Sequence, residues 1–265
     1  MATALSTPLA SSPVRWPLRI VLLGNAYNAL SIECLERLVA AGHDVRVGVY
    51  DATTRGPLRL ARSYTNARGR SFVVRKAIRL AVARTRLVAR RLHIPMRGAL
   101  SLDEACRAHR LRMFLCADPN TPAFVSRLRA EDADIIVIAS FGRILKKRAF
   151  TAARLGCVNV HPSLLPAYRG PYPNYWVLAN GEKTTGVTLH WVDAGVDTGP
   201  IISQLRYPVE RGDTEARLDA KAARAAADLL VATLPLVAAG TAPRTTQDDR
   251  AATYYSFPTR LGAGT

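Results

Sequence analysis

The sequence of 265 residues lacks any apolar run long enough to span a membrane. Hydrophobic residues make up 49% of the chain, but Arg, Gly or Pro interrupts every long apolar stretch. The four cysteines, Cys34, Cys106, Cys116 and Cys157, include no Cys-x-x-Cys pair, which argues against a cysteine-based metal or redox site. We therefore expect reduced, mostly buried thiols in a cytoplasmic protein without a membrane span.

Acidic residues are absent from one long internal segment. Between Asp51 and Asp103 there are thirteen Arg and Lys residues and no carboxylate, so this segment supplies most of the formal net charge of +17. Residues 72–92 lack Gly and Pro and place apolar residues near one helical face, which predicts an amphipathic helix within a basic insert at 52–100. Such a helix fits a solvated face packed on the sheet, a nucleic-acid contact, an acidic substrate or an anionic membrane surface.

The two ends of the chain show no strong periodic pattern. Residues 1–18 are rich in Ser, Thr, Ala and Pro and lack a continuous apolar centre, so we expect a flexible leader rather than a secretory signal. Residues 19–240 are expected to form one domain that contains the basic insert. Residues 241–265 are expected to form an irregular tail on its surface.

A strand–helix–strand pattern opens the expected domain. Residues 18–24 are an apolar run, residues 28–41 carry apolar side chains at helical spacing, and residues 44–49 predict a second strand. Asp213 is the predicted N-cap of a long Ala-rich helix that Gly240 ends. Further strands are predicted at 111–116, 133–139, 185–192 and 201–209, and helices at 122–131 and 172–180. This alternation predicts an α/β, Rossmann-like fold with a mainly parallel central sheet and helices on both faces.

Polar residues follow a buried strand in the segment 157–200. A short apolar run ends in Asn159, Val160 and His161, and Pro/Gly-rich sequence follows it, as at the edge of a sheet where α/β proteins place their chemistry. Because Asn159 and His161 are two residues apart, an extended chain points both side chains to the same side. Asp197 comes later, in the Gly-flanked turn DTGP.

The string SLLPAYRG at 163–170, together with Asn159, His161 and Asp197, resembles the folate-dependent formyltransferase family. That family includes glycinamide ribonucleotide formyltransferase, methionyl-tRNA formyltransferase and the sugar N-formyltransferases. The resemblance covers roughly residues 19–210 and is most specific over 134–200. It implies a formyltransferase catalytic domain and identifies Asn159, His161 and Asp197 as its catalytic trio.

The implied reaction transfers the formyl group of 10-formyltetrahydrofolate, a cosubstrate, to an amine. Asn159 would donate a hydrogen bond to the developing oxyanion, a contact worth about 3 to 4 kcal/mol in oxyanion holes. His161 would donate another as imidazolium, or act as acid and base. Asp197 would favour the charged imidazole and help to remove the amine proton. No metal is expected, because His161 and His190 lack a carboxylate at ligand spacing.

The resemblance also assigns binding residues by position. The segment 140–145 matches the family segment whose backbone binds the pterin ring, and the loop before Asp197 matches the second pterin-lining loop. The expected cofactor contacts are therefore Gly142, Arg143, Leu145, Asp193, Ala194, Gly195 and Val196.

The turn 24–28 resembles the phosphate-holding loop of the glycinamide ribonucleotide enzymes. Ala26 and Tyr27 replace a Gly and a Ser of that loop, which argues against the purine-pathway substrate. The expected acceptor contacts are Asn25, Tyr27, Asn28, Tyr168, Arg169 and Asn174.

Four functions fit these features. The favoured one uses a small-molecule amine, either a nucleotide-linked amino sugar or a specialised-metabolism amine such as hydroxyornithine, because residues 168–176 are similar to the nucleotide-sugar enzymes. Methionyl-tRNA formylation fits the basic insert, but that family adds a C-terminal barrel domain and only a short stretch follows Gly240. Formyltetrahydrofolate hydrolases use a similar trio but carry an N-terminal regulatory domain, whereas the first strand here starts by residue 19. A non-enzymatic anion- or nucleic-acid-binding module leaves the trio unexplained, and the oligomeric state is not predicted.

Overall fold

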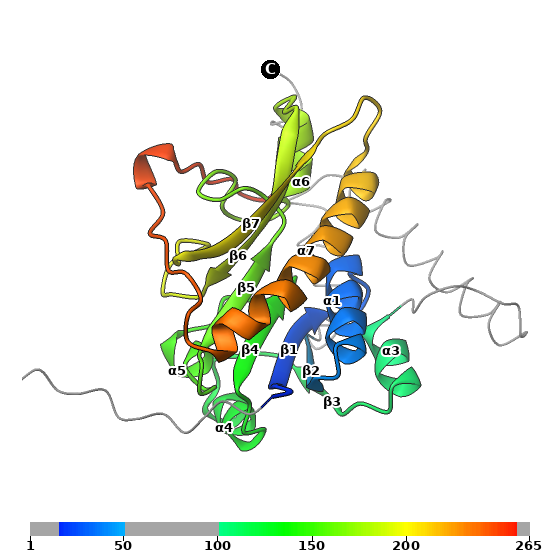
Figure 1. The fold of residues 1–265 in the computed structure, drawn as a ribbon, viewed down its shortest axis with the longest axis vertical. Helices are drawn as coiled ribbons and strands as arrows, with labels where there is room; N and C mark the ends of the chain where they lie inside the picture. The colour runs from blue at the N-terminus through cyan, green and yellow to red at the C-terminus, as the bar shows by residue number, and fades with distance from the viewer. Residues whose placement is uncertain (1–15, 51–100, 259–265) are drawn as a thin grey trace, which may run out of the picture.

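A seven-stranded sheet organises residues 16–50 and 101–258, the parts of the chain that the computed structural model describes (Figure 1). The strand order is β3-β2-β1-β4-β5-β6-β7. The strands are β1 (Arg19–Asn25), β2 (Asp44–Tyr50), β3 (Met113–Cys116), β4 (Ile135–Ala139), β5 (Cys157–His161), β6 (Thr184–Trp191) and β7 (Ile201–Pro208). Strands β1 to β5 pair in parallel, whereas β6 and β7 join in antiparallel. The predicted mainly parallel α/β sheet is confirmed, and the basic insert at 52–100 lies outside the described residues.

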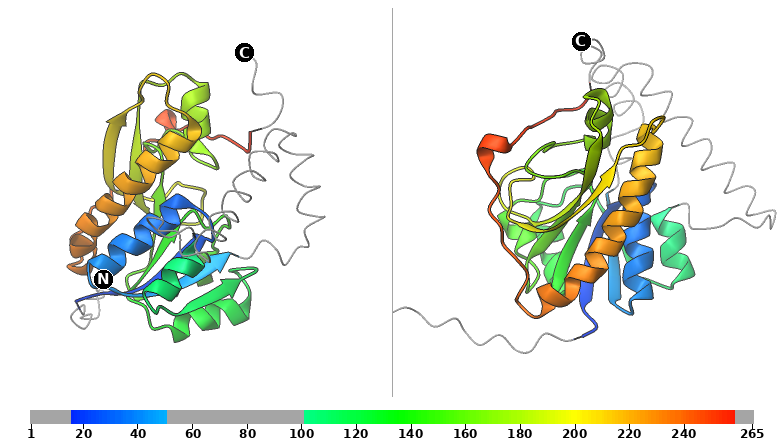
Figure 2. Two further views of the ribbon diagram at one scale, coloured as in Figure 1. Left: turned by 90° about the vertical axis from the view of Figure 1, so that its right-hand side faces the viewer. Right: turned by 45° about the horizontal axis from the view of Figure 1, so that its top comes forward.

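Helices cover both faces of this sheet, as predicted. On one face α1 (Ala29–Ala40) and α7 (Glu215–Ala238) lie side by side, with α3 (Leu102–Ala108) next to α1 (Figures 1 and 2). On the other face lie α4 (Pro122–Ala130) and α5 (Lys147–Phe150). Beyond β5 comes the short helix α6 (Pro173–Ala179), and the 3-10 helix η2 (Asp249–Ala251) lies in the C-terminal tail.

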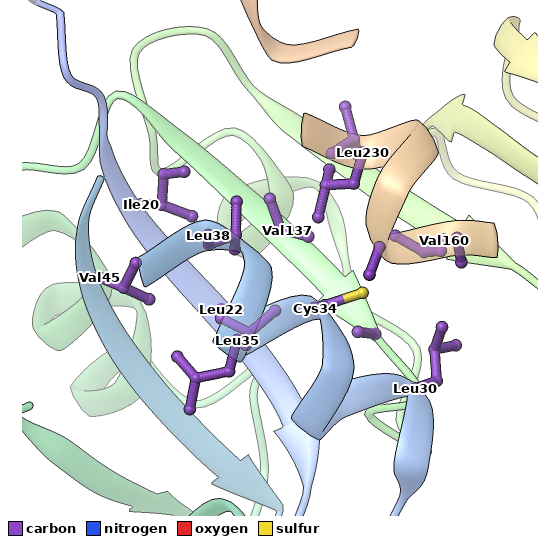
Figure 3. Packing of buried hydrophobic residues seen from close by; sticks show 14 of the residues in the cluster. Ile20, Leu22, Leu30, Cys34, Leu35, Leu38, Val45, Val137, Val160 and Leu230 are labelled. Carbon is purple, nitrogen blue, oxygen red and sulfur yellow. The ribbon is translucent and has the colours of Figure 1, made fainter. Parts of the chain in front are cut away.

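The core on the α1 side follows from two sequence periodicities. Helix α1 presents buried Leu30, Cys34, Leu35 and Leu38 at helical spacing towards the sheet (Figure 3). Strand β1 alternates, so that Ile20 and Leu22 face α1 and α7 while Val21 and Leu23 face α4. Both faces of the sheet are therefore apolar along β1, as expected for a parallel strand between two helical layers.

The start of α7 differs from the prediction. Thr214 is its N-cap, and its Oγ1 accepts a hydrogen bond from the backbone N of Arg217 at 3.3 Å. Asp213 was the wrong choice because its carboxylate lies one residue earlier, where it accepts from the N of Glu210 at 2.9 Å and from Lys221 Nζ at 2.8 Å. It closes the turn before the helix.

The C-terminal tail has little regular structure but is not confined to the surface. Figure 1 shows it running from the end of α7 back past β7 and β6. Thr245 pairs with Ile201 of β7 in an isolated antiparallel bridge, and Gln247 is buried. The other described residues of the tail are exposed or half-buried, whereas the amide of Gln247 binds other parts of the chain.

The four cysteines are free thiols and all are buried. Within residues 16–50 and 101–258, every helix falls short of the length or the apolar character that a membrane crossing requires.

The sheet face opposite α1 and α7 is covered in two ways. Over β1 to β4, helices α4 and α5 pack apolar side chains against it. Over β5 the alternation of Val158 and Val160, which face α7, turns Asn159 and His161 to the opposite face. Loops 163–170 and 193–199 and the tail cover these side chains. A buried polar cluster beside an apolar helical layer therefore marks where the candidate site lies.

Candidate active site

Asn159, His161 and Asp197 meet on this loop-covered part of the sheet. Asn159 Nδ2 donates a hydrogen bond to Asp197 Oδ1 at 3.2 Å, and His161 Nδ1 lies 3.7 Å from Asp197 Oδ2. The backbone N of Gly170 also donates to Asp197 Oδ2, at 2.9 Å. The structure thus brings together the three side chains that the sequence singled out.

Asp197 reaches the site by an unexpected route. Because β6 runs antiparallel to β5, its last residue, Trp191, lies opposite Val158 and away from the strand end that carries His161. The β6–β7 loop folds back across the sheet face, and Asp197 adopts a left-handed backbone with φ of 54°. Asp193 stabilises this loop, since its Oδ1 accepts from Gly195 N at 3.0 Å and from Thr198 Oγ1 at 2.7 Å. The sequence prediction placed Asp197 in a Gly-flanked turn between two strands but did not show that this turn folds back across the sheet face.

His190 is a fourth polar member of the cluster. Antiparallel pairing places it opposite Asn159, and its Nε2 lies 3.1 Å from Asn159 Nδ2 and 3.7 Å from Asp197 Oδ1. Its Nδ1 lies 2.9 Å from the carbonyl oxygen of Trp191, so this nitrogen carries the hydrogen. In the neutral ring Nε2 then accepts from Asn159. The sequence offered one signal for His190, its position on a strand that follows the His161 segment, but only the strand register shows its partner.

Burial and charge set the protonation states of His161 and Asp197. Burial lowers the pKa of His161 below its ordinary value of 6.5, although the negative charge of Asp197 opposes this shift. Burial would raise the pKa of Asp197, but His161, His190 and the N–H of Gly170 together hold it well below its usual range. His161 Nε2 lies 2.8 Å from the carbonyl oxygen of Tyr168 and therefore carries the hydrogen. At neutral pH the unprotonated Nδ1 of a neutral imidazole faces an ionised carboxylate.

The amide of Asn159 is committed within this cluster. Its two N–H groups donate to His190 Nε2 and Asp197 Oδ1. A donor role towards a formyl oxygen therefore requires Asn159 to exchange one of these two hydrogen bonds for a bond to the ligand.

The predicted cofactor segment forms a turn after β4. Ser140 and Gly142 have left-handed backbones, with φ of 60° and 76°. The side chain of Leu145 is buried in the core beside α4, and the guanidinium of Arg143 lies 5.0 Å from the ring centre of Tyr50. The Nε of Arg143 is buried and makes no hydrogen bond within the described part of the chain. This turn thus offers backbone groups and one unused donor, which fits a ligand rich in polar ring atoms.

The predicted acceptor residues fall into two groups. Those of the β1–α1 turn lie beside the end of β4, because Gly24 pairs with Ala139, and Tyr27 is 61% exposed there. Asn28 is the N-cap of α1, and its Oδ1 accepts from Leu30 N.

The second group is bound within the chain itself. Tyr168 donates through its hydroxyl to Glu182 at 2.5 Å, and Asn174 Nδ2 donates to Asp219 Oδ1 at 3.0 Å. Arg169 is buried and bonds to the tail. Contacts between these three side chains and an acceptor stay a prediction.

Metal-binding clusters were also searched for in the part of the chain with described coordinates. Residues 16–50 and 101–258 contain no group of three or more His, Cys, Asp or Glu side chains arranged to hold a metal ion.

Comparison with known proteins finds methionyl-tRNA formyltransferases among the sequence relatives. The chain is 44% identical over 133 residues to the methionyl-tRNA formyltransferase of Synechococcus sp. (strain JA-3-3Ab), which covers 50% of this chain and 41% of that protein. It is 36% identical over 163 residues to the methionyl-tRNA formyltransferase of Ruminiclostridium cellulolyticum, covering 62% of this chain and 52% of that protein. The chain thus spans about half the length of these curated relatives.

Solved structures share the fold. The N-formyltransferase from Helicobacter canadensis, solved with folinic acid and dTDP-3-aminofucose, has a TM-score of 0.61 at 19% identity, over 92% of this chain and 71% of that chain. Glycinamide ribonucleotide transformylase 1 from Symbiobacterium toebii has a TM-score of 0.60 at 22% identity, over 89% of this chain and 99% of that chain. A family model described as formyl transferase matches residues 91–234, a range that includes Asn159, His161 and Asp197. Because this match covers more than half of the sequence, the chain belongs to the formyl transferase family.

Proposed function

We propose that the protein transfers the formyl group of 10-formyltetrahydrofolate to a primary amine. The observation that carries this proposal is the buried cluster in which the imidazole of His161, the carboxylate of Asp197 and the amide of Asn159 converge. Acyl transfer to an amine needs a base for the amine proton and a donor for the oxyanion. These groups are supplied by His161, Asp197 and Asn159. The Asp197 carboxylate lies 3.7 Å from His161 Nδ1 and 3.2 Å from Asn159 Nδ2.

His161 acts as the base in this mechanism. The amine nitrogen attacks the formyl carbon, and its proton passes to His161 Nδ1, which is unprotonated because burial lowers the pKa of the ring. The charge of Asp197, 3.7 Å away, then stabilises the imidazolium. When the bond between the formyl carbon and the folate nitrogen breaks, His161 returns the proton to the leaving nitrogen. A base role explains the neutral ring better than a permanent imidazolium does.

Asn159 stabilises the tetrahedral intermediate. One of its N–H groups leaves His190 or Asp197 and donates to the oxyanion, and such a donor contributes about 3 to 4 kcal/mol in known oxyanion holes. His190 keeps the amide oriented through its Nε2 until that exchange.

The folate lies between the turn after β4 and the loop before Asp197 in this proposal. Gly142, Arg143 and Leu145 contribute mainly backbone, and the unused Nε of Arg143 supplies a donor to a polar ring atom. The second wall is formed by Asp193, Ala194, Gly195 and Val196. When bound, the folate supplies the activated formyl group.

A small-molecule amine is the first candidate acceptor, either a nucleotide-linked amino sugar or an amine such as hydroxyornithine. It would enter past Asn25, Tyr27 and Asn28, at the end of β1, where Tyr27 is exposed. Methionyl-tRNA is the second candidate acceptor, because the sequence relatives reported above are named methionyl-tRNA formyltransferases.

Product analysis tests the proposal. Purified protein is incubated with 10-formyltetrahydrofolate and, separately, nucleotide-linked amino sugars, hydroxyornithine, methionyl-tRNA or no acceptor, and both tetrahydrofolate and formylated product are measured. Asp197→Asn is expected to lower the rate by at least about a hundredfold, the scale for losing a group that acts in proton transfer. Asp228→Asn is the control, because among the described residues Asp228 pairs only with surface Arg37, at 2.8 Å.

Each outcome of this assay is decisive. Formate release without any acceptor would identify a hydrolase instead, and a near-wild-type rate for Asp197→Asn would overturn the mechanism. For methionyl-tRNA, binding that weakens steeply between about 50 and 200 mM salt would show that several phosphates are contacted. Product from methionyl-tRNA alone would replace the small-molecule acceptor.

A further inference from the structure

The C-terminal tail inserts one buried amide beneath the turn that carries Asp197. Gln247 is 7% exposed, and its Nε2 donates to the carbonyl oxygens of Asp197 at 2.9 Å and Gly199 at 2.7 Å. Its Oε1 accepts from Nε and a terminal nitrogen of Arg169, at 3.1 and 2.9 Å. The carbonyls require a donor and the guanidinium requires an acceptor, so the orientation of the amide is unambiguous.

Arg169 is in turn fixed by the tail. Its backbone N donates to Thr253 O at 2.9 Å, and its backbone O accepts from Tyr255 N at 2.9 Å. Its guanidinium also pairs with Asp249 at 2.9 Å. With 8% of Arg169 exposed, the guanidinium is largely occupied by the chain itself.

The turn needs such support because its conformation is unfavourable. Asp197 has a left-handed backbone, which costs a non-glycine residue free energy and persists only where the surroundings over-determine it. Next to the turn, Gly170 has φ of 98°, and a Cβ there would lie 2.2 Å from Tyr255 O of the tail. The N of Gly170 also donates to the Asp197 carboxylate. One network therefore joins the tail, the 168–170 loop and the catalytic candidate.

We propose that Gln247 is a positioning residue for Asp197, and that Arg169 acts through Gln247 rather than on the acceptor. This inference rests on the proposed function, in which Asp197 stabilises the His161 imidazolium. The family match ends at residue 234, so the tail that provides Gln247 lies beyond the matched range. Loss of the two hydrogen bonds lets the Asp197 turn relax, and the carboxylate moves away from His161 Nδ1.

Two substitutions of similar size test the proposal. Gln247→Glu keeps the acceptor for Arg169 but loses both donors to the turn, whereas Gln247→Met loses both links. A positioning role predicts that each variant lowers kcat about ten- to hundredfold, the scale of a misplacement of about 1 Å, with KM for the folate unchanged. If Gln247 only attached the tail, Gln247→Glu would behave as wild type, because its carboxylate gains an ion pair with Arg169.

Gln204→Glu is the matched control. Gln204 is exposed, and its Nε2 also makes two hydrogen bonds, to Leu165 O and Thr188 Oγ1 at 2.8 Å each, neither of which goes to the Asp197 turn. We expect the kcat of Gln204→Glu to stay within about threefold of wild type, because a substitution away from the Asp197 turn leaves the Asp197 carboxylate in place. Arg169→Lys separates the two roles of Arg169: a lower kcat at unchanged acceptor KM supports the link through Gln247, and a raised acceptor KM alone overturns it.

Amide hydrogen exchange gives a readout that does not depend on activity. In Gln247→Glu the peptide that contains Gly170 N–H should exchange at least about tenfold faster, because its acceptor moves, while α4 peptides stay unchanged. Faster exchange with wild-type kcat, or unchanged exchange, overturns the proposal. An inactive wild-type protein would refute the proposed function, yet the exchange result would still show whether Gln247 holds the turn.

Discussion

The two halves of the sheet face opposite α1 and α7 differ in the side chains that they bury and in the segments that cover them. Over β1 to β4, helices α4 and α5 bury side chains such as Leu128, Ile136 and Phe141 in a continuous apolar cluster. Over β5 and β6, the buried groups include the imidazoles of His161 and His190, which loops and the tail cover instead of a helical layer. A helix satisfies its own backbone and leaves little for a buried polar side chain, whereas loops present free N–H and C=O groups.

Backbone strain follows the same division. The described residues include six non-glycine residues with positive φ, and of these Arg110 and Asp132 simply follow the last turns of α3 and α4. The other four, Ser140, Tyr168, Tyr172 and Asp197, lie in the turn after β4 or in the loops around the candidate site. The apolar half of the face thus carries stability, whereas the turn after β4 and the loop-covered half carry strain that hydrogen bonds hold in place.

The strongest way to break this comparison is to damage the apolar half alone. Leu128→Ala removes a side chain that is 2% exposed, and we expect the free energy of unfolding to fall by about 2 to 5 kcal/mol through lost burial and the cavity left behind. The formyl-transfer rate of the folded fraction should stay within about threefold of wild type, because distant sites act independently. Denaturant titration and single-turnover assays measure the two quantities. A rate loss that matches the stability loss would show that the halves are not separable.

A smaller effect is expected at the boundary between the halves. Asn120 supports the predicted folate turn, since its Nδ2 donates to Ile144 O at 3.0 Å and its Oδ1 accepts from Lys146 N at 2.7 Å. Asn120→Ala should weaken binding of 5-formyltetrahydrofolate about tenfold in calorimetry, the scale of one or two net hydrogen bonds. Asn120→Asp, which keeps the acceptor, should lose less affinity. Unchanged affinity in both variants would contradict the placement of the folate at this turn.

The smallest expected effect is the pH dependence of the transfer rate, because His161 titrates in the loop-covered half. Because the pKa of His161 is lowered, the neutral base form of its imidazole is fully present above the ordinary value of 6.5. This form is lost only when the pH falls through the lowered pKa. The transfer rate should change by less than about threefold between pH of about 6.5 and 8 and then fall about tenfold per unit at low pH. Folate affinity, which involves the turn after β4, should not follow this curve. A rate that rises on acidification would instead support the imidazolium role.

Much of the fold follows from local patterns. The strand prediction at 44–49 and the helix at 28–41 rest on alternating and helical periodicity, and the structure places β2 and α1 there. Short elements such as α3 and α5 escaped prediction because a few residues cannot establish a period. The wrong N-cap at Asp213 shows the usual limit at an element boundary, where two neighbouring residues can both cap.

The sequence by itself determined that Asn159 and His161 share one face, because side-chain direction along a strand depends only on the local backbone. Only the tertiary structure decided that His190 faces Asn159, since strand register is set by packing across the sheet. It also decided that Asp197 returns across the face and that Gln247 bonds to its carbonyl oxygen, because such contacts join segments far apart in the chain. The depressed pKa of His161 belongs to the same class, as burial by distant segments produces it.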